Sequence, residues 1–274
     1  MAFLTTLLAA NITASKKMNF LDYFKPPEDI SVHGHLIDEL FGFTTILVAF
    51  FFILVCLVLF GFSYRYSKKR SPKAEYTHGN RKKQMLGAIF MGLFVFMAID
   101  MNIVKMSNND ALNVFMNFPE EDKEDVIRIE VLAQQWAWSF RYSGADGTFN
   151  TDDDIVTFND LRLPIGKKVV LQMISKDVIH SFWIPNARRK VDAMPGRISR
   201  VWYEFTKAGV WDIACAEMCG TNHYKMAAKL TTYSPEEYKS WLAEAQQMAY
   251  DTLEENNMDR YWGWKWQAKL SSNQ

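Results

Sequence analysis

The stretch CAEMCGTNHYKM, from Cys215 to Met226, places two cysteines, a histidine and a methionine within twelve residues. Thiolate and thioether are soft donors that suit copper, and imidazole also binds copper. A single blue-copper site uses one Cys, two His and a weak axial Met. This stretch offers one thiolate more, and a second thiolate would let two copper ions share both sulfurs as bridges. Such a pair can gain and lose one electron with little change in geometry.

Other chemistries fit the same two cysteines. Cys215 and Cys219 could form a disulfide in an oxidising compartment. With His223 and a second candidate, His180, they could bind zinc, which would leave Met226 unused. A thiol oxidoreductase usually has CxxC spacing rather than CxxxC, and that hypothesis leaves both histidines unexplained. The third cysteine of the chain, at position 56, lies in an apolar run and is interpreted as a packing residue.

Two apolar runs precede this region. Leu40 to Tyr64 is 25 residues without a charge, and Gln84 to Val104 is interrupted only by Asp100. About 20 apolar residues span a bilayer core, so the runs predict a transmembrane helical hairpin. The second run alone would also suit a buried helix of a soluble protein. Asp100 lies near the end of its run, from where a charge can reach the membrane surface.

The loop between the runs, residues 65–83, holds eight Lys or Arg residues and one Glu. The positive-inside rule places this loop in the cytoplasm and both chain ends outside. The first residues, 1–17, resemble a signal peptide in their apolar stretch but lack its positive start, so cleavage and retention stay open. The formal net charge of zero gives no reason to expect nucleic acid as a partner.

Many short β-rich runs separated by turn residues follow, which predicts a Greek-key sandwich or small barrel. The runs are 126–133, 136–142, 168–174, 178–184, 198–205, 210–214 and 226–233. The Asp- and Gly-rich insertion 143–154 lacks the ligand pattern of an EF-hand and predicts a solvated hairpin tip. Ser234, Pro235 and Glu237 predict a capped helix start, and an aromatic, basic tail ends the chain.

CAEMCGTNHYKM, SKDVIHSFWIPNARRKVDAMPGR (175–197) and AQQWAWSFRY (133–142) together resemble subunit II of cytochrome c oxidase, in the haem–copper oxidase superfamily. The resemblance covers about Leu36 to Tyr238. It implies an all-β cupredoxin-like Greek-key barrel preceded by a two-helix transmembrane hairpin. The expected division is an outer segment 1–37, the hairpin 38–105, a periplasmic copper domain 106–234 and a C-terminal helix and tail 235–274.

The resemblance also implies a binuclear copper centre, CuA. Its implied ligands are His180, Cys215, Cys219, His223, Met226 and the backbone carbonyl of Glu217. The side chain of Glu217 is expected to bind Mg or Mn at the contact with the catalytic subunit, since these hard ions prefer oxygen. Asp192 and Arg197 match family positions at that contact and near the haem propionates.

Trp136 resembles the tryptophan at which electrons arrive in the family. The family's docking surface for cytochrome c is acidic, which attracts a basic donor at long range. Asp177 is the acidic residue next to the copper motif. Other outer acids are Glu120, Glu121, Asp122, Glu124, Asp125, Asp152, Asp153 and Asp154, which could equally be solvated loop residues.

Two departures from the family pattern stand out. Arg141 occupies a place where an acidic docking residue often appears, which weakens the expected docking surface for cytochrome c. Lys83 and Gln84 occupy the place where the family has a glutamate at the mouth of a proton channel. The proton-entry role of that glutamate therefore cannot be assigned to any residue of this chain.

The expected function is therefore electron relay in an oxidase. The chain would accept electrons from cytochrome c at CuA and pass them to haem in catalytic subunit I, which reduces oxygen to water and pumps protons. It would lie in a bilayer, most simply a bacterial inner membrane, with both termini periplasmic. The alternatives are a membrane-tethered copper chaperone or storage protein and a quinol oxidase subunit, a branch that lacks the copper ligands present here.

Overall fold

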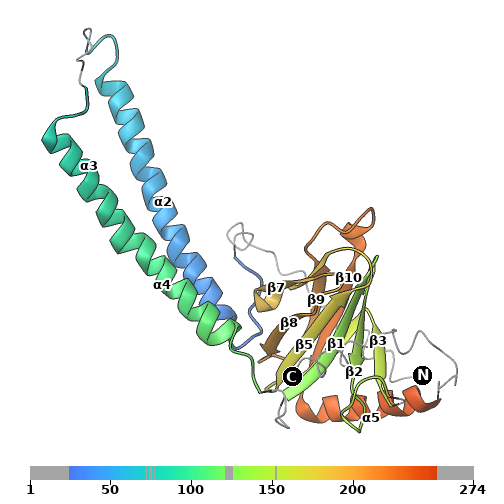
Figure 1. Ribbon diagram of the computed structural model, residues 1–274. Coiled ribbons are helices and arrows are strands. Elements are labelled where there is room, and N and C mark those ends of the chain that lie inside the picture. The colour runs from blue at the N-terminus through green and yellow to red at the C-terminus, as the bar shows by residue number, and fades with distance from the viewer. Residues whose placement is uncertain are drawn as a thin grey trace, which may run out of the picture.

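The structure is a computed structural model that describes residues 25–71, 73, 76, 78–120, 126–151 and 153–251, with side chains to residue 249. The signal-peptide question, the acids at 121–125 and 152, and the aromatic tail lie outside these residues. Within them, a long helical hairpin meets one end of a β-domain (Figure 1).

The hairpin consists of α2 (Gly34–Arg65) and a second helix made of α3 (Lys82–Val95), η2 (Phe96–Asp100), α4 (Met101–Asp110) and η3 (Ala111–Phe115). Both helices are long and apolar enough to cross a membrane. The prediction of two apolar helices is confirmed.

The second helix runs past the expected boundary at residue 105. The segment from Met101 to Phe115 contains neither Gly nor Pro, and the first proline follows at Pro119. A helix can therefore continue almost to that proline, before which the helical conformation is disfavoured.

Large apolar side chains cover the surface of the hairpin. Phe41, Phe52, Phe60 and Phe90 are all mostly exposed in this chain. An apolar surface of this extent needs lipid or partner helices to cover it.

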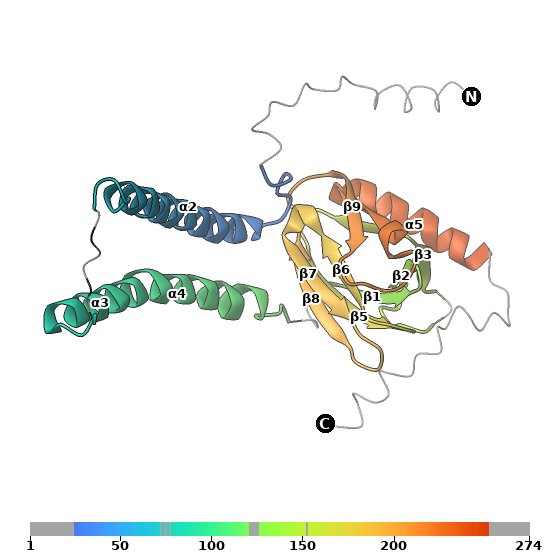
Figure 2. The ribbon, with the colours of Figure 1, turned by 90° about the horizontal axis from the view of Figure 1, so that it is seen from above.

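The β-domain is a sandwich of two five-stranded sheets, ordered β3-β2-β1-β5-β8 and β4-β10-β9-β6-β7 (Figure 2). The strands are β1 (Val126–Gln134), β2 (Ala137–Tyr142), β3 (Ile155–Phe158), β4 (Asp160–Pro164), β5 (Lys168–Ser175), β6 (His180–Ile184), β7 (Arg189–Ala193), β8 (Ser199–Glu204), β9 (Gly209–Cys215) and β10 (Ala227–Tyr233). Parallel pairing of β1 with β5 and of β4 with β10 mixes with antiparallel pairs. All seven predicted β-runs form strands. The strands β3, β4 and β7 were not predicted, because β3 has only four residues and the short strands β4 and β7 carry charged residues.

Alternate residues of the strands fill the core between the sheets. In β1 the inward residues are Ile129, Val131 and Ala133, and in β2 they include Trp138 and Phe140, all without exposed surface. Side chains on successive strand positions point to opposite faces, which accounts for this spacing. Trp136 precedes β2 and is only partly buried at the edge of the core.

The insertion 143–154 joins β2 to β3, which form an antiparallel pair, as predicted. It is not simply solvated, because Phe149, Asp153 and Asp154 are buried. Asp154 packs against Arg141, with 3.4 Å between Oδ2 and Nε. The insertion therefore folds back over the outer face of the sheet.

Arg141 is fully buried in this arrangement, and it also pairs with Glu130 across β1 and β2 at 3.2 Å. The expectation that Arg141 alters a docking surface for cytochrome c is therefore wrong, because a side chain without exposed surface cannot contact a partner. Its position on the outer face of the sheet would be exposed if the insertion did not cover it.

The helix α5 (Pro235–Asp251) closes the described chain and packs on the sandwich beside β3, β4 and β10. Ser234 and Glu237 form the predicted capping box: the backbone N–H and hydroxyl of Ser234 donate to Glu237 Oε2 at 3.0 and 2.8 Å, and the Glu237 N–H donates back.

Candidate metal centre

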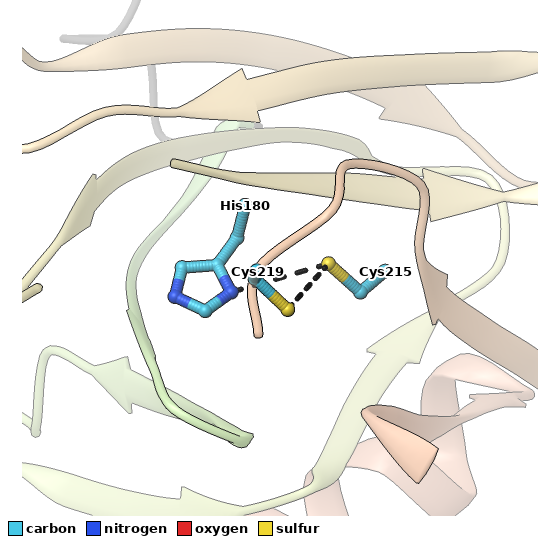
Figure 3. Close-up of side chains that lie close together, drawn as sticks. All are labelled: His180, Cys215 and Cys219. Carbon is cyan, nitrogen blue, oxygen red and sulfur yellow. Dashed lines mark hydrogen bonds between the residues drawn. The ribbon is translucent and has the colours of Figure 1, made fainter. Parts of the chain in front are cut away.

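The candidate donors come from two neighbouring strands and the loop that follows one of them. His180 begins β6 and Cys215 ends β9, and these strands pair antiparallel. The backbone N–H of Cys215 donates to the carbonyl of Met226 at 3.1 Å, which closes the loop between them. Figure 3 shows His180, Cys215 and Cys219 converging from these elements.

The two thiols lie at the middle of the cluster. Their Sγ atoms are 3.7 Å apart, and both cysteines are free. His180 Nδ1 lies 3.9 Å from Cys215 Sγ, and His223 Nδ1 lies 3.5 Å from Cys219 Sγ. Each sulfur therefore has an imidazole of its own.

Two further donors complete the set. Met226 Sδ lies 3.8 Å from Cys219 Sγ, and the Glu217 carbonyl oxygen lies 3.3 Å from Cys215 Sγ. The structure thus brings together all six groups that the family resemblance implied, the Glu217 carbonyl included. His180, Cys215, Cys219 and Met226 are buried, whereas His223 is partly exposed.

Asp177 orients the first of the two imidazoles. Its Oδ1 lies 2.8 Å from His180 Nε2, so the Nε2–H group donates to the carboxylate and Nδ1 is left facing the sulfurs. Asp177 also accepts the backbone N–H of Gln135 at 2.6 Å. A carboxylate behind a histidine ligand fixes its tautomer and ring orientation. The sequence singled out Asp177 as a docking acid, and its place three residues before His180 was the signal for this other role.

The surroundings of the two thiols shift their pKa values in opposite directions. Burial opposes ionisation of Cys215, but its contact with His180 prevails and lowers its pKa to about 6. Burial and the neighbouring Cys215 raise the pKa of Cys219 to about 12. One thiolate thus forms readily, and a second negative charge at 3.7 Å requires a cation between or beside the sulfurs.

Trp136 lies directly on the ligand loop. Its indole Nε1–H donates to the Cys219 carbonyl at 3.2 Å, and the Gln135 side chain donates to the same oxygen at 2.8 Å. Gly220 permits this approach: a Cβ there would lie 2.9 Å from Gln135 Nε2 and 3.2 Å from Trp136 Cζ2, and its φ is +117°.

The remaining predicted residues lie on the surface near the site. Asp192 on β7 pairs with Ser181, the neighbour of His180, and its side chain is exposed. Glu217 and Arg197 are exposed as well. The Glu217 backbone faces the sulfurs while its side chain faces outward, so one residue can serve two contacts.

The donor set fits copper. Two thiols, two imidazoles, a thioether and a carbonyl converge, whereas a structural zinc site needs four donors. A β-sandwich with such a cluster at one end, preceded by two membrane-length helices, defines a membrane-anchored, cupredoxin-like protein with a copper-type site.

Comparison with known proteins finds a family model that matches the β-domain and relatives that match most of the chain. The family described as cytochrome c oxidase subunit II, periplasmic domain, matches residues 127–232. The alternative cytochrome c oxidase subunit 2 of Bradyrhizobium diazoefficiens is 29% identical over 242 residues, covering 80% of this chain and 84% of the relative. Cytochrome c oxidase subunit 2 of Thermostichus vulcanus is 35% identical over 141 residues, covering 52% of this chain and 40% of the relative.

Among solved structures, the periplasmic domain of cytochrome oxidase subunit II from Bradyrhizobium japonicum aligns with 26% identity and a TM-score of 0.41, over 47% of this chain and 97% of that domain. Residues 127–232 thus match the periplasmic domain of cytochrome c oxidase subunit II, and most of the chain is similar to a subunit 2 protein.

Proposed function

We propose that this chain is the electron-relaying subunit of a cytochrome c oxidase. It accepts electrons from cytochrome c at a binuclear CuA site and passes them to haem in a catalytic subunit, which reduces oxygen to water and pumps protons. The observation that carries the proposal is the pair of free thiols 3.7 Å apart, each beside its own imidazole. When bound, the copper pair would supply reversible storage of one electron.

The chain's own residues would hold and connect that site. His180, Cys215, Cys219, His223 and Met226 would hold copper with their side chains, and Glu217 would do so with its carbonyl. Asp177 would keep His180 in the correct tautomer. Trp136 would take up the electron, since one hydrogen bond joins its indole to the backbone of Cys219.

Burial of the donors argues against a copper chaperone. His180 has no exposed surface, and Cys219 and Met226 are each 2% exposed. Delivery of copper to an acceptor needs ligands that the acceptor can reach, whereas retention needs the enclosure seen here.

The exposed residues beside the site suit contact with the catalytic subunit. We assign Glu217 to a Mg or Mn ion shared with that subunit, and Asp192 and Arg197 to the same contact. Exposed Glu217 offers the hard oxygen ligands that these ions prefer. We assign the chain to an outer segment 1–37, a membrane hairpin 38–105, a copper domain 106–234 and a C-terminal part 235–274, with the second helix continuing to Phe115.

Electron paramagnetic resonance of the full-length protein, purified from membranes after copper loading, tests the copper assignment. One unpaired electron shared by two equivalent copper nuclei should give a multi-line hyperfine pattern. Met226→Leu should shift the spectrum and the potential but keep the pair. A mononuclear spectrum, bound zinc, or a Cys215–Cys219 disulfide in the matured protein would refute the proposal.

Trp136→Phe tests the route of electrons. The variant keeps an aromatic ring but loses the hydrogen bond to the Cys219 carbonyl, so we expect slower reduction of the copper site by cytochrome c in the assembled oxidase. The copper spectrum should stay the same. Reduction at the parent rate would remove Trp136 from the route.

A further inference from the structure

One two-stranded ribbon links the candidate copper site to the membrane hairpin. In the β6–β7 pair, His180 lies opposite Ala193 at one end and Ile184 opposite Arg189 at the other. Arg188 forms the turn between the two strands, with a φ of +61°. The ribbon therefore carries a proposed copper ligand at one end and two consecutive arginines at the other.

Arg188 forms an ion pair with the first helix, α2. Its Nε donates to Asp38 Oδ1 at 2.7 Å and its Nη2 donates to Asp38 Oδ2 at 2.9 Å, which is a bidentate ion pair across 150 residues of chain. The side chain of Arg188 is 8% exposed and that of Asp38 is 33% exposed. Paired, charge-assisted hydrogen bonds of this kind are among the stronger polar contacts and set orientation as well as distance.

Arg189 forms a hydrogen bond with the end of the second helix. Its guanidinium donates to the Phe115 carbonyl at 3.4 Å and to the Trp202 carbonyl at 2.9 Å. Trp202 Nε1–H donates to the carbonyl of Val114 at 3.2 Å. The last carbonyls of a helix lack partners within the helix and attract donors and positive charge, so these two side chains complete the helix end.

The chain that leads into α2 is tied to the same part of the domain. The Ile30 N–H donates to the carbonyl of Asn186 at 3.1 Å, and the Val32 N–H donates to that of Glu204 at 3.0 Å. Figure 2 shows β7 and β8 on the side of the sandwich that faces the hairpin. Both helices are thus attached to one edge of the β-domain.

We propose that Arg188 and Arg189 are positioning residues that hold the copper domain in a fixed position on the membrane hairpin. We call the contacts of Arg188 with Asp38 and of Arg189 with Phe115 the lock. Domains joined through small contacts move relative to one another by default. Here the lock would hold the copper site at a constant distance from the catalytic subunit, which the hairpin would contact. The consequence for electron transfer rests on the proposed function, whereas the lock itself does not.

The test uses the assembled oxidase with Arg188→Asn and, separately, Asp38→Asn. Asn tolerates the positive φ of position 188, so the first variant removes the ion pair while keeping the backbone. We expect amide hydrogen exchange at Ile30 and Val32 to become about tenfold faster in both variants, because local opening becomes easier. The copper spectrum should not change, and electron transfer from copper to haem should slow.

Two controls separate the lock from general destabilisation. Asp212→Asn removes an ion pair with Lys229 that is remote from the hairpin and exposed, Asp212 by 73%, and should leave exchange and electron transfer as in the parent. Arg188→Asp combined with Asp38→Arg should restore slow exchange, since it rebuilds the pair with reversed charges.

Parent-like exchange at Ile30 and Val32 in both single variants would overturn the lock. Faster exchange with unchanged transfer to haem would overturn its positioning role. If the parent protein lacked a binuclear copper spectrum, the proposed function would fail, and the exchange measurement would still decide whether the lock exists.

Discussion

At the scale of single residues, the metal site depends on side chains that are not donors to the metal. Asp177 holds the Nε2 side of His180, and Gly220 leaves room for Trp136 against the ligand loop. Neither would donate a ligand atom to copper. Asp177 nevertheless fixes the orientation of the His180 ring, and Gly220 permits the contact of Trp136 with the ligand loop. A histidine whose ring can rotate binds metal less well than one already held in place.

Asp177→Asn tests this dependence. The amide keeps the size of the carboxylate but removes its charge, so His180 loses its strongest partner. We expect copper affinity to fall by about tenfold, at the low end of the range for outer partners of metal ligands. Competition with a chelator of known affinity measures the change, and Asp212→Asn serves as the control. Equal affinities of the Asp177→Asn variant and the parent would contradict the role.

At the scale of elements, the insertion 143–154 covers part of the outer face of the β3-β2-β1-β5-β8 sheet. Arg141 is enclosed with two carboxylates, those of Glu130 and Asp154. Burial raises the pKa of Glu130 to about 7, although Arg141 opposes the shift, and burial likewise raises the pKa of Asp154 to about 6. One cation thus faces two buried acids, and the acids relieve the imbalance by binding protons.

The stability of the β-domain should therefore depend on pH. Because the folded-state pKa of Glu130 exceeds its ordinary value of 4.5, this group's stabilising contribution is complete below pH 4.5 and is lost as pH rises through about 7. The loss is roughly 3 kcal/mol for a shift of that size. Urea unfolding followed by tryptophan fluorescence measures it, and Glu130→Gln should flatten the dependence. A variant with the parent's slope would contradict the prediction.

At the scale of the whole molecule, the β-domain with its copper-type site lies at one end of the helical hairpin (Figure 1). Both chain segments that join the hairpin to the domain lie at the same end of the helices (Figure 1). The described residues of the basic loop, 65–71, 73, 76 and 78–83, lie at the opposite end of the helices (Figure 1). The side of the membrane that receives this loop therefore decides the side on which the β-domain lies.

Protease accessibility tests the orientation with the loop cytoplasmic. Trypsin cleaves after Lys and Arg, of which the loop 65–83 holds eight. Inside-out membrane vesicles should lose the loop to trypsin, and right-side-out vesicles should keep it, because basic loops stay on the cytoplasmic side. The reverse pattern would place the copper domain in the cytoplasm.

Several properties of this protein are local and can be recognised in the sequence alone. The two membrane-length helices follow from uninterrupted apolar runs, and the capping box of α5 from Ser234 and Glu237. The donor types between Cys215 and Met226 also stand within one short loop. Each depends on neighbouring residues, whose spacing is enough to predict local structure or chemistry.

Other properties arise only when distant strands come together. The pairing of β6 with β9 brings His180 to Cys215, 35 residues along the chain. The folding back of 143–154 buries Arg141, which the sequence would place on an outer face. The ion pair between Arg188 and Asp38 joins the β-domain to the hairpin. Strand register and loop closure decide these contacts, and both depend on the whole packed sandwich rather than on any one segment.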